Sequence, residues 1–275
     1  MALDRPETSH SAASRLSLTP ISHNAQAGKW RTEAMRSHTS PRLMYIGKGQ
    51  GRITIAGLTS GYGPNNLIFI PAGTMYGYEA GPTVYGQMLT IPSAMAADWP
   101  EEPVHLRLRD VITQKELVGH FDNLERELKS DRSGHSRAAH HYLGILSVYF
   151  ERQLALQPDN SSELERARSA SARLVAAYSD LIERDFRKSY GVADYAAALG
   201  VTPTHLTRCC KQTCGRSALS LLNDRVLFEA RVLLRETRAP IQDIAKSLGF
   251  TSPAYFTRSF QAATGQTPSA FRNRT

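Results

Sequence analysis

An internal repeat in the last third of the chain constrains its fold more than any other feature. Residues 192–202 (VADYAAALGVT) align with residues 241–251 (IQDIAKSLGFT) at an offset of 49. After one inserted residue the offset becomes 50, so that residues 206–208 match residues 256–258. A repeat of this kind indicates one supersecondary unit that the chain uses twice.

Each copy of the repeat predicts a helix, a glycine turn and a second helix. Gly200 ends the first helix, where a left-handed conformation costs glycine little. Thr202 is a good N-cap for the second helix, and Pro203 is a good first helical residue. The second copy has Ser and Pro at the same two places. Two helices joined by a short glycine turn form a helix-turn-helix, which we expect over residues 192–213 and 240–263.

The second helix of each unit separates apolar from polar side chains. Leu206 and Cys210, spaced i and i+4, are expected to point inward. In a helix-turn-helix the opposite face enters the major groove, where arginine can bond guanine or clamp a phosphate. We expect more direct base readout from the first unit, and more phosphate and apolar contact from the second. The expected DNA contacts are Thr204, His205, Thr207, Arg208 and Lys211 in the first unit and Pro253, Ala254, Tyr255, Thr257 and Arg258 in the second.

The excess positive charge is confined to the part of the chain that contains the repeat. The net charge is +8, with 33 Lys and Arg against 25 Asp and Glu. Residues 1–186 have 20 basic and 20 acidic side chains, and residues 187–275 have 13 and 5. A basic surface kept for solubility would give the same balance. Together with two helix-turn-helix units, however, the charge predicts binding to double-stranded DNA.

Composition and hydropathy exclude several other classes of protein. No apolar stretch reaches the ~18 residues that a membrane span needs. The first 20 residues contain no apolar core of a signal peptide, so we expect a cytoplasmic protein without a membrane partner. The sequence contains no Gly-x-Ser-x-Gly, His-Glu-x-x-His or phosphate-loop motif. We therefore expect no enzyme, no catalytic residue, no metal and no cofactor.

The cysteines suggest an alternative mode of regulation. Cys209, Cys210 and Cys214 are an odd, clustered set, which is not a disulfide scaffold. Cys209 is expected at the edge of the DNA-facing stripe beside Arg208, and a neighbouring cation lowers a thiol pKa. A thiol- or redox-responsive DNA-binding regulator is therefore the alternative to one controlled by a small molecule.

The chain before the repeat divides into a β-rich and a helical part. Residues 41–92 contain short apolar runs separated by Gly and Pro, which are typical of a small sandwich or barrel. Amphipathic helices are predicted over 114–129 and 135–156, and we expect them to dimerise or to couple the domains. The predicted fold class is α+β, with a sensor domain at 1–100, a helical region at 101–175 and an all-α DNA-binding domain at 176–275.

The last third resembles the AraC/XylS family of bacterial transcription regulators. The matching segments are residues 194–211, 225–234, 241–245, 248–250, 254–260 and 268–272. The resemblance implies two helix-turn-helix units joined by one long helix, reading successive major grooves on one face of promoter DNA. It also implies a homodimer that works with RNA polymerase, more often as an activator than as a repressor.

The N-terminal part resembles the cupin-type sensor domain of the same family, over residues 38–92. Metal cupins have a His at the position of Tyr76 and a second His two residues after His38, where this chain has Ser40. The resemblance therefore implies a small-molecule effector rather than a metal. The residues around Tyr195 and Glu229 are similar to those of regulators of aromatic-acid catabolism, which implies an aromatic acid. The candidate ligand contacts, taken as inward-facing strand residues, are Tyr45, Phe69, Tyr76, Tyr78, Tyr85 and Gln87.

Two further alternatives stay open from the sequence. One is a cupin catalyst with an appended DNA-binding module. The other is a regulator without a ligand, controlled only by its abundance.

Overall fold

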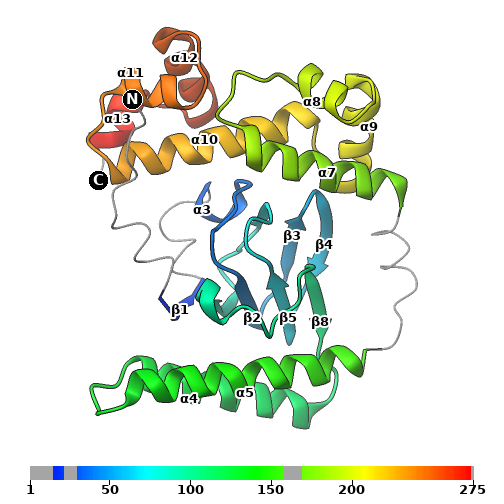
Figure 1. Ribbon diagram of the computed structural model, residues 1–275, viewed down its shortest axis with the longest axis vertical. Coiled ribbons are helices and arrows are strands. Elements are labelled where there is room, and N and C mark those ends of the chain that lie inside the picture. Colours follow the sequence, from blue (N-terminus) through cyan, green and yellow to red (C-terminus); the bar gives the residue numbers. More distant parts are fainter. Residues whose placement is uncertain (1–14, 22–29, 158–168, 274–275) are drawn as a thin grey trace.

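The computed structural model describes residues 15–21, 30–157 and 169–273. Figure 1 shows three layers, with a helical hairpin below, two β-sheets in the middle and a layer of helices above. This arrangement confirms the predicted α+β class, with the sheets before the helical C-terminal part.

The middle layer consists of two antiparallel sheets. The larger has the order β1-β7-β2-β5-β8 and the smaller has the order β4-β3-β6. Because β8 pairs with β5, the sheet extends past the domain boundary that we expected at residue 100. The strands of the larger sheet are β1 (Ser17–Pro20), β2 (Arg42–Lys48), β5 (Asn66–Ile70), β7 (Tyr85–Thr90) and β8 (Val104–Arg107), and those of the smaller are β3 (Gly51–Ile55), β4 (Leu58–Tyr62) and β6 (Tyr76–Tyr78).

The larger sheet is apolar on both faces, because each face covers a different core. On β2, Met44 and Ile46 face the smaller sheet and pack with Ile53. Leu43 and Tyr45, which alternate with them, face the opposite side. Successive side chains of a strand point to opposite faces, so the alternation follows directly from the register.

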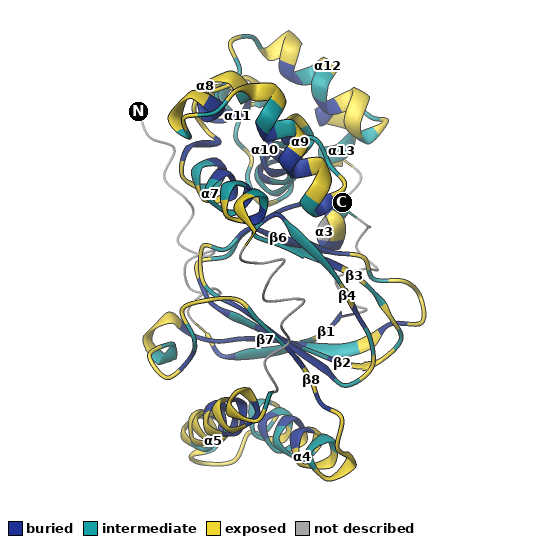
Figure 2. Cartoon of the chain, turned by 90° about the vertical axis from the view of Figure 1, so that its right-hand side faces the viewer, coloured by how far each residue is buried: buried dark blue, intermediate teal, exposed yellow. Residues whose placement is uncertain are grey.

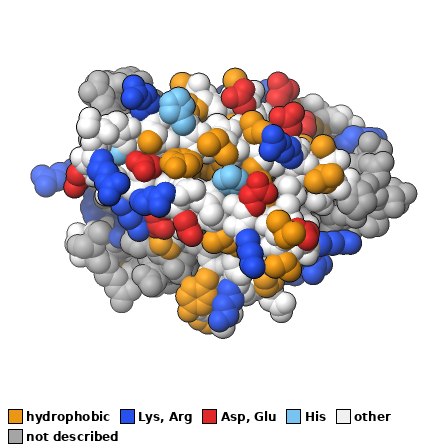
Figure 3. Space-filling model, turned by 90° about the horizontal axis from the view of Figure 1, so that it is seen from below, with side chains coloured by type: hydrophobic (Ala, Val, Ile, Leu, Met, Phe, Trp, Pro, Cys, Tyr) orange, Lys and Arg blue, Asp and Glu red, His pale blue; other side chains and the backbone are white. Residues whose placement is uncertain are grey.

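The helical hairpin of α4 (Val111–Leu128) and α5 (His135–Ala155) covers the outer face of the larger sheet. Asp110 caps α4, because its carboxylate accepts a hydrogen bond from the Thr113 amide at 2.8 Å. Leu117 and Phe121 are buried against the sheet. The lower face of the hairpin shows apolar side chains among charged ones (Figure 3).

The upper layer is a single helical domain with one hydrophobic core. Its first helix, α7, carries the buried residues Val175, Tyr178 and Ile182, which all belong to that core. The boundary expected at residue 176 therefore falls inside one amphipathic helix and is wrong. The helices of this layer are α7 (Ala170–Asp185), α8 (Val192–Ala198), α9 (Pro203–Cys214), α10 (Ala218–Glu236), α11 (Ile241–Ser247), α12 (Pro253–Thr264) and α13 (Pro268–Asn273).

The sensor sheets and the helical domain share part of one core. Met35 and Met75, from the sensor part, belong to the same cluster of buried residues as α7 and α9. A short helix, α3 (Trp30–Glu33), lies between the sheets and α10, and its Trp30 ring lies 5.8 Å from the ring of Phe228. Among the helices of the described ranges, none has the length and apolarity needed to cross a membrane.

Candidate nucleic-acid interface and sensor interior

The first helix-turn-helix is formed by α8 and α9, as predicted. Gly200 is in the left-handed region with φ +68°, and the Thr202 hydroxyl accepts a hydrogen bond from the His205 amide at 3.2 Å. Leu206 and Cys210 are fully buried under α9. The capped N-terminus and the buried stripe together fix which side of α9 faces outward.

The outward side of α9 presents the polar residues predicted to contact DNA. Thr204, Arg208 and Lys211 are exposed, and His205 and Thr207 are half-buried. The Arg208 guanidinium lies 3.0 Å from Nδ1 of His205, one helical turn earlier. This pairing holds the two side chains side by side on the outward face.

The second unit, formed by α11 and α12, repeats this construction with fewer polar donors. Ser252 accepts a hydrogen bond from the Tyr255 amide at 3.1 Å, and Phe256 and Phe260 are buried. The remaining residues of the predicted set lie on the outside: Pro253, Ala254, Tyr255 and Arg258 are exposed and Thr257 is half-buried.

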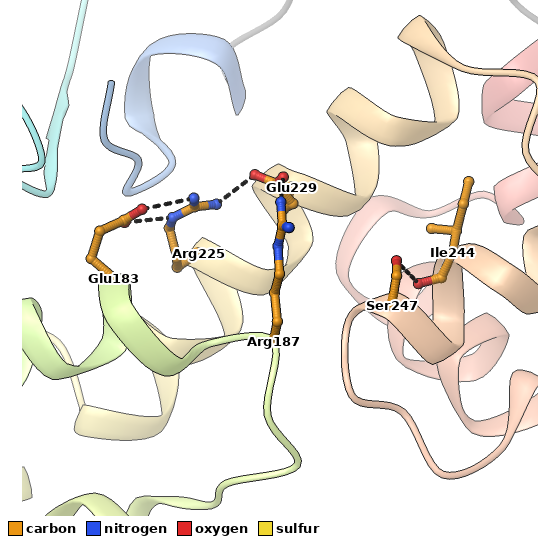
Figure 4. A network of polar contacts seen from close by, with 6 residues as sticks. All are labelled: Glu183, Arg187, Arg225, Glu229, Ile244 and Ser247. Carbon is orange, nitrogen blue, oxygen red and sulfur yellow. Dashed lines mark hydrogen bonds and ion pairs between the residues drawn. The ribbon is translucent and has the colours of Figure 1, made fainter. Parts of the chain in front are cut away.

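A buried ion network joins α7 to α10, the long helix between the two units (Figure 4). Arg225 on α10 is 4% exposed and donates to both carboxylate oxygens of Glu183 on α7, at 2.6 and 2.9 Å. It also donates to Glu229 at 3.0 Å, and Glu229 accepts a second bond from Arg187 at 2.5 Å. The Arg225 guanidinium stacks on Phe186, 3.8 Å from the ring centre.

The charges of this network stabilise one another. Burial alone would raise the pKa of Glu229, but the neighbouring Arg225 and Arg187 lower it overall. The ion pairs therefore tie α7 and α10 together as one unit. Our sequence reading did not find this network, although Arg225 and Glu229 stand at the i and i+4 spacing of a helical ion pair.

One of the three cysteines, Cys209, lies elsewhere than expected, whereas Cys210 is buried as predicted. Cys209 is 2% exposed and lies inside the core, with its Sγ 3.6 Å from Nε2 of His205. Cys210 and Cys214 are buried as well, and all three thiols are free. Burial raises the pKa of Cys210 to about 12 and also raises the pKa of Cys214. The prediction that Cys209 lies at the edge of the DNA-facing stripe is wrong, because that position faces the core side of α9.

Four of the six candidate ligand contacts do not face the interior between the sheets. The Tyr45 ring lies 5.4 Å from that of Phe121 on α4, and the Phe69 ring stacks on Trp99 at 5.3 Å. Gln87 is the register partner of Tyr45 and points to the same side. Tyr85, two residues earlier on β7, is 56% exposed on that side. The expected orientation of these side chains is therefore wrong, because they lie on the opposite face of the larger sheet. This applies to Tyr45, Phe69, Tyr85 and Gln87.

Tyr76 and Tyr78 do face the interior between the sheets, where they are buried. The Arg36 guanidinium stacks on both rings, at 4.6 and 5.3 Å from their centres, and donates to the Thr32 carbonyl at 2.8 Å. The His38 ring lies 5.8 Å from that of Tyr76. Burial, together with the charges of Arg42 and Arg36, lowers the pKa of His38 well below its usual value.

The side chains that fill this interior do not form a metal site. Within residues 15–21, 30–157 and 169–273, no three His, Cys, Asp or Glu side chains come close enough together to hold a metal ion.

Comparison with known proteins agrees with both halves of the structure. Residues 24–144 match the family model described as the AraC-like ligand binding domain, and residues 195–274 match the one described as a helix-turn-helix domain. The arabinose operon regulatory protein of Escherichia coli is 25% identical over 230 residues, which are 82% of this chain and 77% of that protein.

Two further similarities are to one curated regulator and to one solved structure. The HTH-type transcriptional regulator GlxA of Rhizobium meliloti is 31% identical over 117 residues, 42% of this chain and 36% of that protein. Among solved structures, apo ToxT from Vibrio cholerae aligns over 94% of this chain and 96% of its own, with 13% identity and a TM-score of 0.43. The two matching family models together cover most of the sequence in the order sensor, then DNA-binding domain. The chain belongs to the AraC/XylS family of transcription regulators, with an AraC-like ligand-binding domain followed by a DNA-binding helix-turn-helix domain.

Proposed function

We propose that the chain binds promoter DNA sequence-specifically by inserting α9 and α12 into two major grooves on one face of the duplex. The observation that carries this proposal is that both helices are built alike. Each begins with a Pro directly after its N-cap and buries an i and i+4 pair of side chains, Leu206 with Cys210 or Phe256 with Phe260. Each also presents an exposed arginine, Arg208 or Arg258, on the outward side. The ten residues predicted from the sequence remain our proposed DNA contacts.

A footprint on the DNA that flanks the gene for this chain tests the proposal. We expect protection on one face over two adjacent helical turns, which are ~34 Å apart. The protection should weaken steeply between low and high salt, because phosphate contacts release counterions. If random genomic fragments bind equally well, or if nothing binds, sequence-specific recognition by this domain would be refuted.

We propose that the chain acts as a homodimer held together by the α4–α5 hairpin. The support is the outer side of this hairpin, where Val118, Ile145 and Val148 are 40%, 48% and 43% exposed although they are apolar. Ile145 and Val148 are three residues apart, so they share one side of α5, away from the buried Leu143 and Leu146. Exposed apolar side chains on two adjacent helices fit a second copy of the same surface.

We further propose that a small organic acid controls this regulator, that it activates transcription by contacting RNA polymerase, and that it does so in the cytoplasm. The ligand-binding domain that packs directly on the DNA-binding domain supports control by a small molecule. Transcription in vitro with purified RNA polymerase tests whether the protein activates or represses. More transcript in the presence of the regulator is expected, and less transcript would make it a repressor.

A further inference from the structure

A cavity of about 560 Å³ lies between the sensor sheets and the DNA-binding domain. One wall comes from α3 and the strands β3, β4 and β6, and the opposite wall comes from the end of α9 and from α10. Its size is in the range of small-molecule sites. Since neither domain alone surrounds it, anything bound there contacts both domains at once.

The cavity contains a guanidinium that is partly buried without an ion-pair partner. Arg231 on α10 lines it, and within the described part of the chain no carboxylate lies within 4.0 Å of its nitrogens. Burial lowers the pKa of Arg231, and the charge of Asp224 offsets this only in part. A desolvated cation without a counterion is costly, and a bound anion would compensate for it.

The other arginines near this site are already neutralised or face solvent. Arg216 pairs with Asp224, so that carboxylate is occupied. Arg225 and Arg187 share the carboxylates of the buried network below α10. Arg52, at the sensor side of the cavity, is exposed. Arg231 is therefore the cation of the cavity wall that a ligand can pair with inside the protein.

The surroundings of Arg231 indicate the rest of the ligand. Its guanidinium lies 5.4 Å from the centre of the Trp30 ring, and Trp30 lines the cavity too. On the sensor side the hydroxyls of Thr54 and Thr59 lie 2.7 Å apart and bond to each other. Most other lining residues are charged or polar, including Glu33 and Glu79, which suits a compact polar molecule better than a long aliphatic chain.

We propose that this cavity is the effector site and that it binds an aromatic monocarboxylate, with the carboxylate on Arg231, the ring beside Trp30 and a ring hydroxyl toward Thr54 and Thr59. This inference rests on the proposed function, because it takes the chain to be a DNA-binding regulator that a ligand controls. Glu33 and Glu79 disfavour a second negative charge, so a monoanion fits better than a dianion. Because the ligand contacts both domains, it stabilises the state in which they are docked.

Titration calorimetry on the full chain tests this assignment, with 4-hydroxybenzoate as the probe and its neutral amide, 4-hydroxybenzamide, as the matched ligand control. We expect the acid to bind wild type and the amide to bind at least about tenfold more weakly, the usual effect of losing a charge-assisted pair. The substitution Arg231→Gln should lower the affinity for the acid by about the same factor. Arg235→Gln, one turn further along α10 and outside the cavity, should leave its affinity unchanged.

Each other outcome overturns the assignment. No binding of 4-hydroxybenzoate to wild type, equal binding of acid and amide, or full affinity in Arg231→Gln would do so. If Arg231→Gln does not fold, Arg231→Lys replaces it. Lysine keeps the positive charge but lacks the planar guanidinium that can form two parallel hydrogen bonds. The affinity of this variant for the acid should lie between the affinities of wild type for the acid and for the amide. A footprint of wild type without ligand reports DNA binding separately, so failure of the cavity assignment can be distinguished from failure of the proposed function.

Discussion

Gly57, at the tip of the β3–β4 hairpin, lies directly against Val175 on α7, so closely that a Cβ at Gly57 would overlap the Val175 side chain. The same Cβ would lie 3.3 Å from the Ser179 hydroxyl. Gly57 also has φ +76°, in the left-handed region that other residues avoid. The sensor hairpin therefore reaches the first helix of the DNA-binding domain at a point where only glycine fits.

The first prediction is that Gly57→Ala weakens the contact between the two domains. The added methyl group and the left-handed backbone should together destabilise the chain by ~1–3 kcal/mol. Urea unfolding measures this, and limited proteolysis reports whether the domains separate. Gly63→Ala is the matched control, because a Cβ at Gly63 meets nothing within 4 Å. Equal stability of the two variants would show that the hairpin tip has room for a side chain.

The second prediction concerns the buried ion network. Arg225→Gln should cost ~3–5 kcal/mol of unfolding free energy, because it leaves Glu183 and Glu229 without their shared partner in a buried place. Chemical denaturation measures the loss. The control is Lys129→Gln, which breaks the exposed pair with Glu125 and should cost less than ~1 kcal/mol. Similar effects of the two substitutions would mean that the network contributes little.

The sequence predicted the helix-turn-helix units well because their signals are local. A glycine turn, an N-cap and a proline at the first helical position lie within a few residues of one another, and each has one good structural solution. The strand faces could not be predicted in the same way. Because β2 and β5 are apolar on both faces, the sequence does not show which face Tyr45 and Phe69 belong to until the register is known.

Long-range features were missed for a related reason. The cavity beside Arg231 and the pairing of Arg225 with Glu183 depend on how α10 packs against elements more than 40 residues away in sequence. For Cys209 the sequence predicts a place at the edge of the DNA-facing stripe of α9, beside Arg208. In the structure, the core of the domain covers that side of the helix.

The third prediction is that the three thiols react slowly in the native protein. Burial raises the pKa of Cys210 to about 12, so this thiol stays protonated and its reaction with Ellman's reagent should hardly increase between pH 7 and 9. In denaturant Cys210 and Cys214 regain an ordinary pKa of ~8.5, and the rate of their reaction should rise steeply over that range.

This measurement also decides the alternative mode of regulation. A thiol-responsive regulator needs a reactive cysteine in its folded state. If the native protein reacts quickly and loses DNA binding until a reductant is added, redox control is supported. Variants in which Cys209, Cys210 and Cys214 are each replaced by Ser would then identify the responsive thiol.

The fourth prediction is that Ile145→Glu disrupts the dimer. A charge in the middle of the apolar surface of α5 must be buried when two copies meet, which opposes association. Sedimentation at several concentrations should show a dimer for wild type and a monomer for the variant. Glu151→Gln, on an exposed site of the same helix, is the control. A wild-type monomer at all concentrations would contradict the proposed interface.

The fifth prediction tests the recognition helix itself. Arg208 is exposed on α9 beside His205, so Arg208→Ala removes a group that contacts base edges or phosphate without disturbing the buried Leu206. We expect a loss of ~1–3 kcal/mol in specific DNA binding and an unchanged unfolding midpoint.

The variant Arg258→Ala should weaken binding to many sequences alike and lower the salt dependence of binding, because we expect the second unit to contact mainly phosphate. Arg137→Ala, on the exposed side of α5 far from both units, should bind as wild type does. Wild-type affinity in the Arg208 variant would show that the outward side of α9 does not contact the DNA.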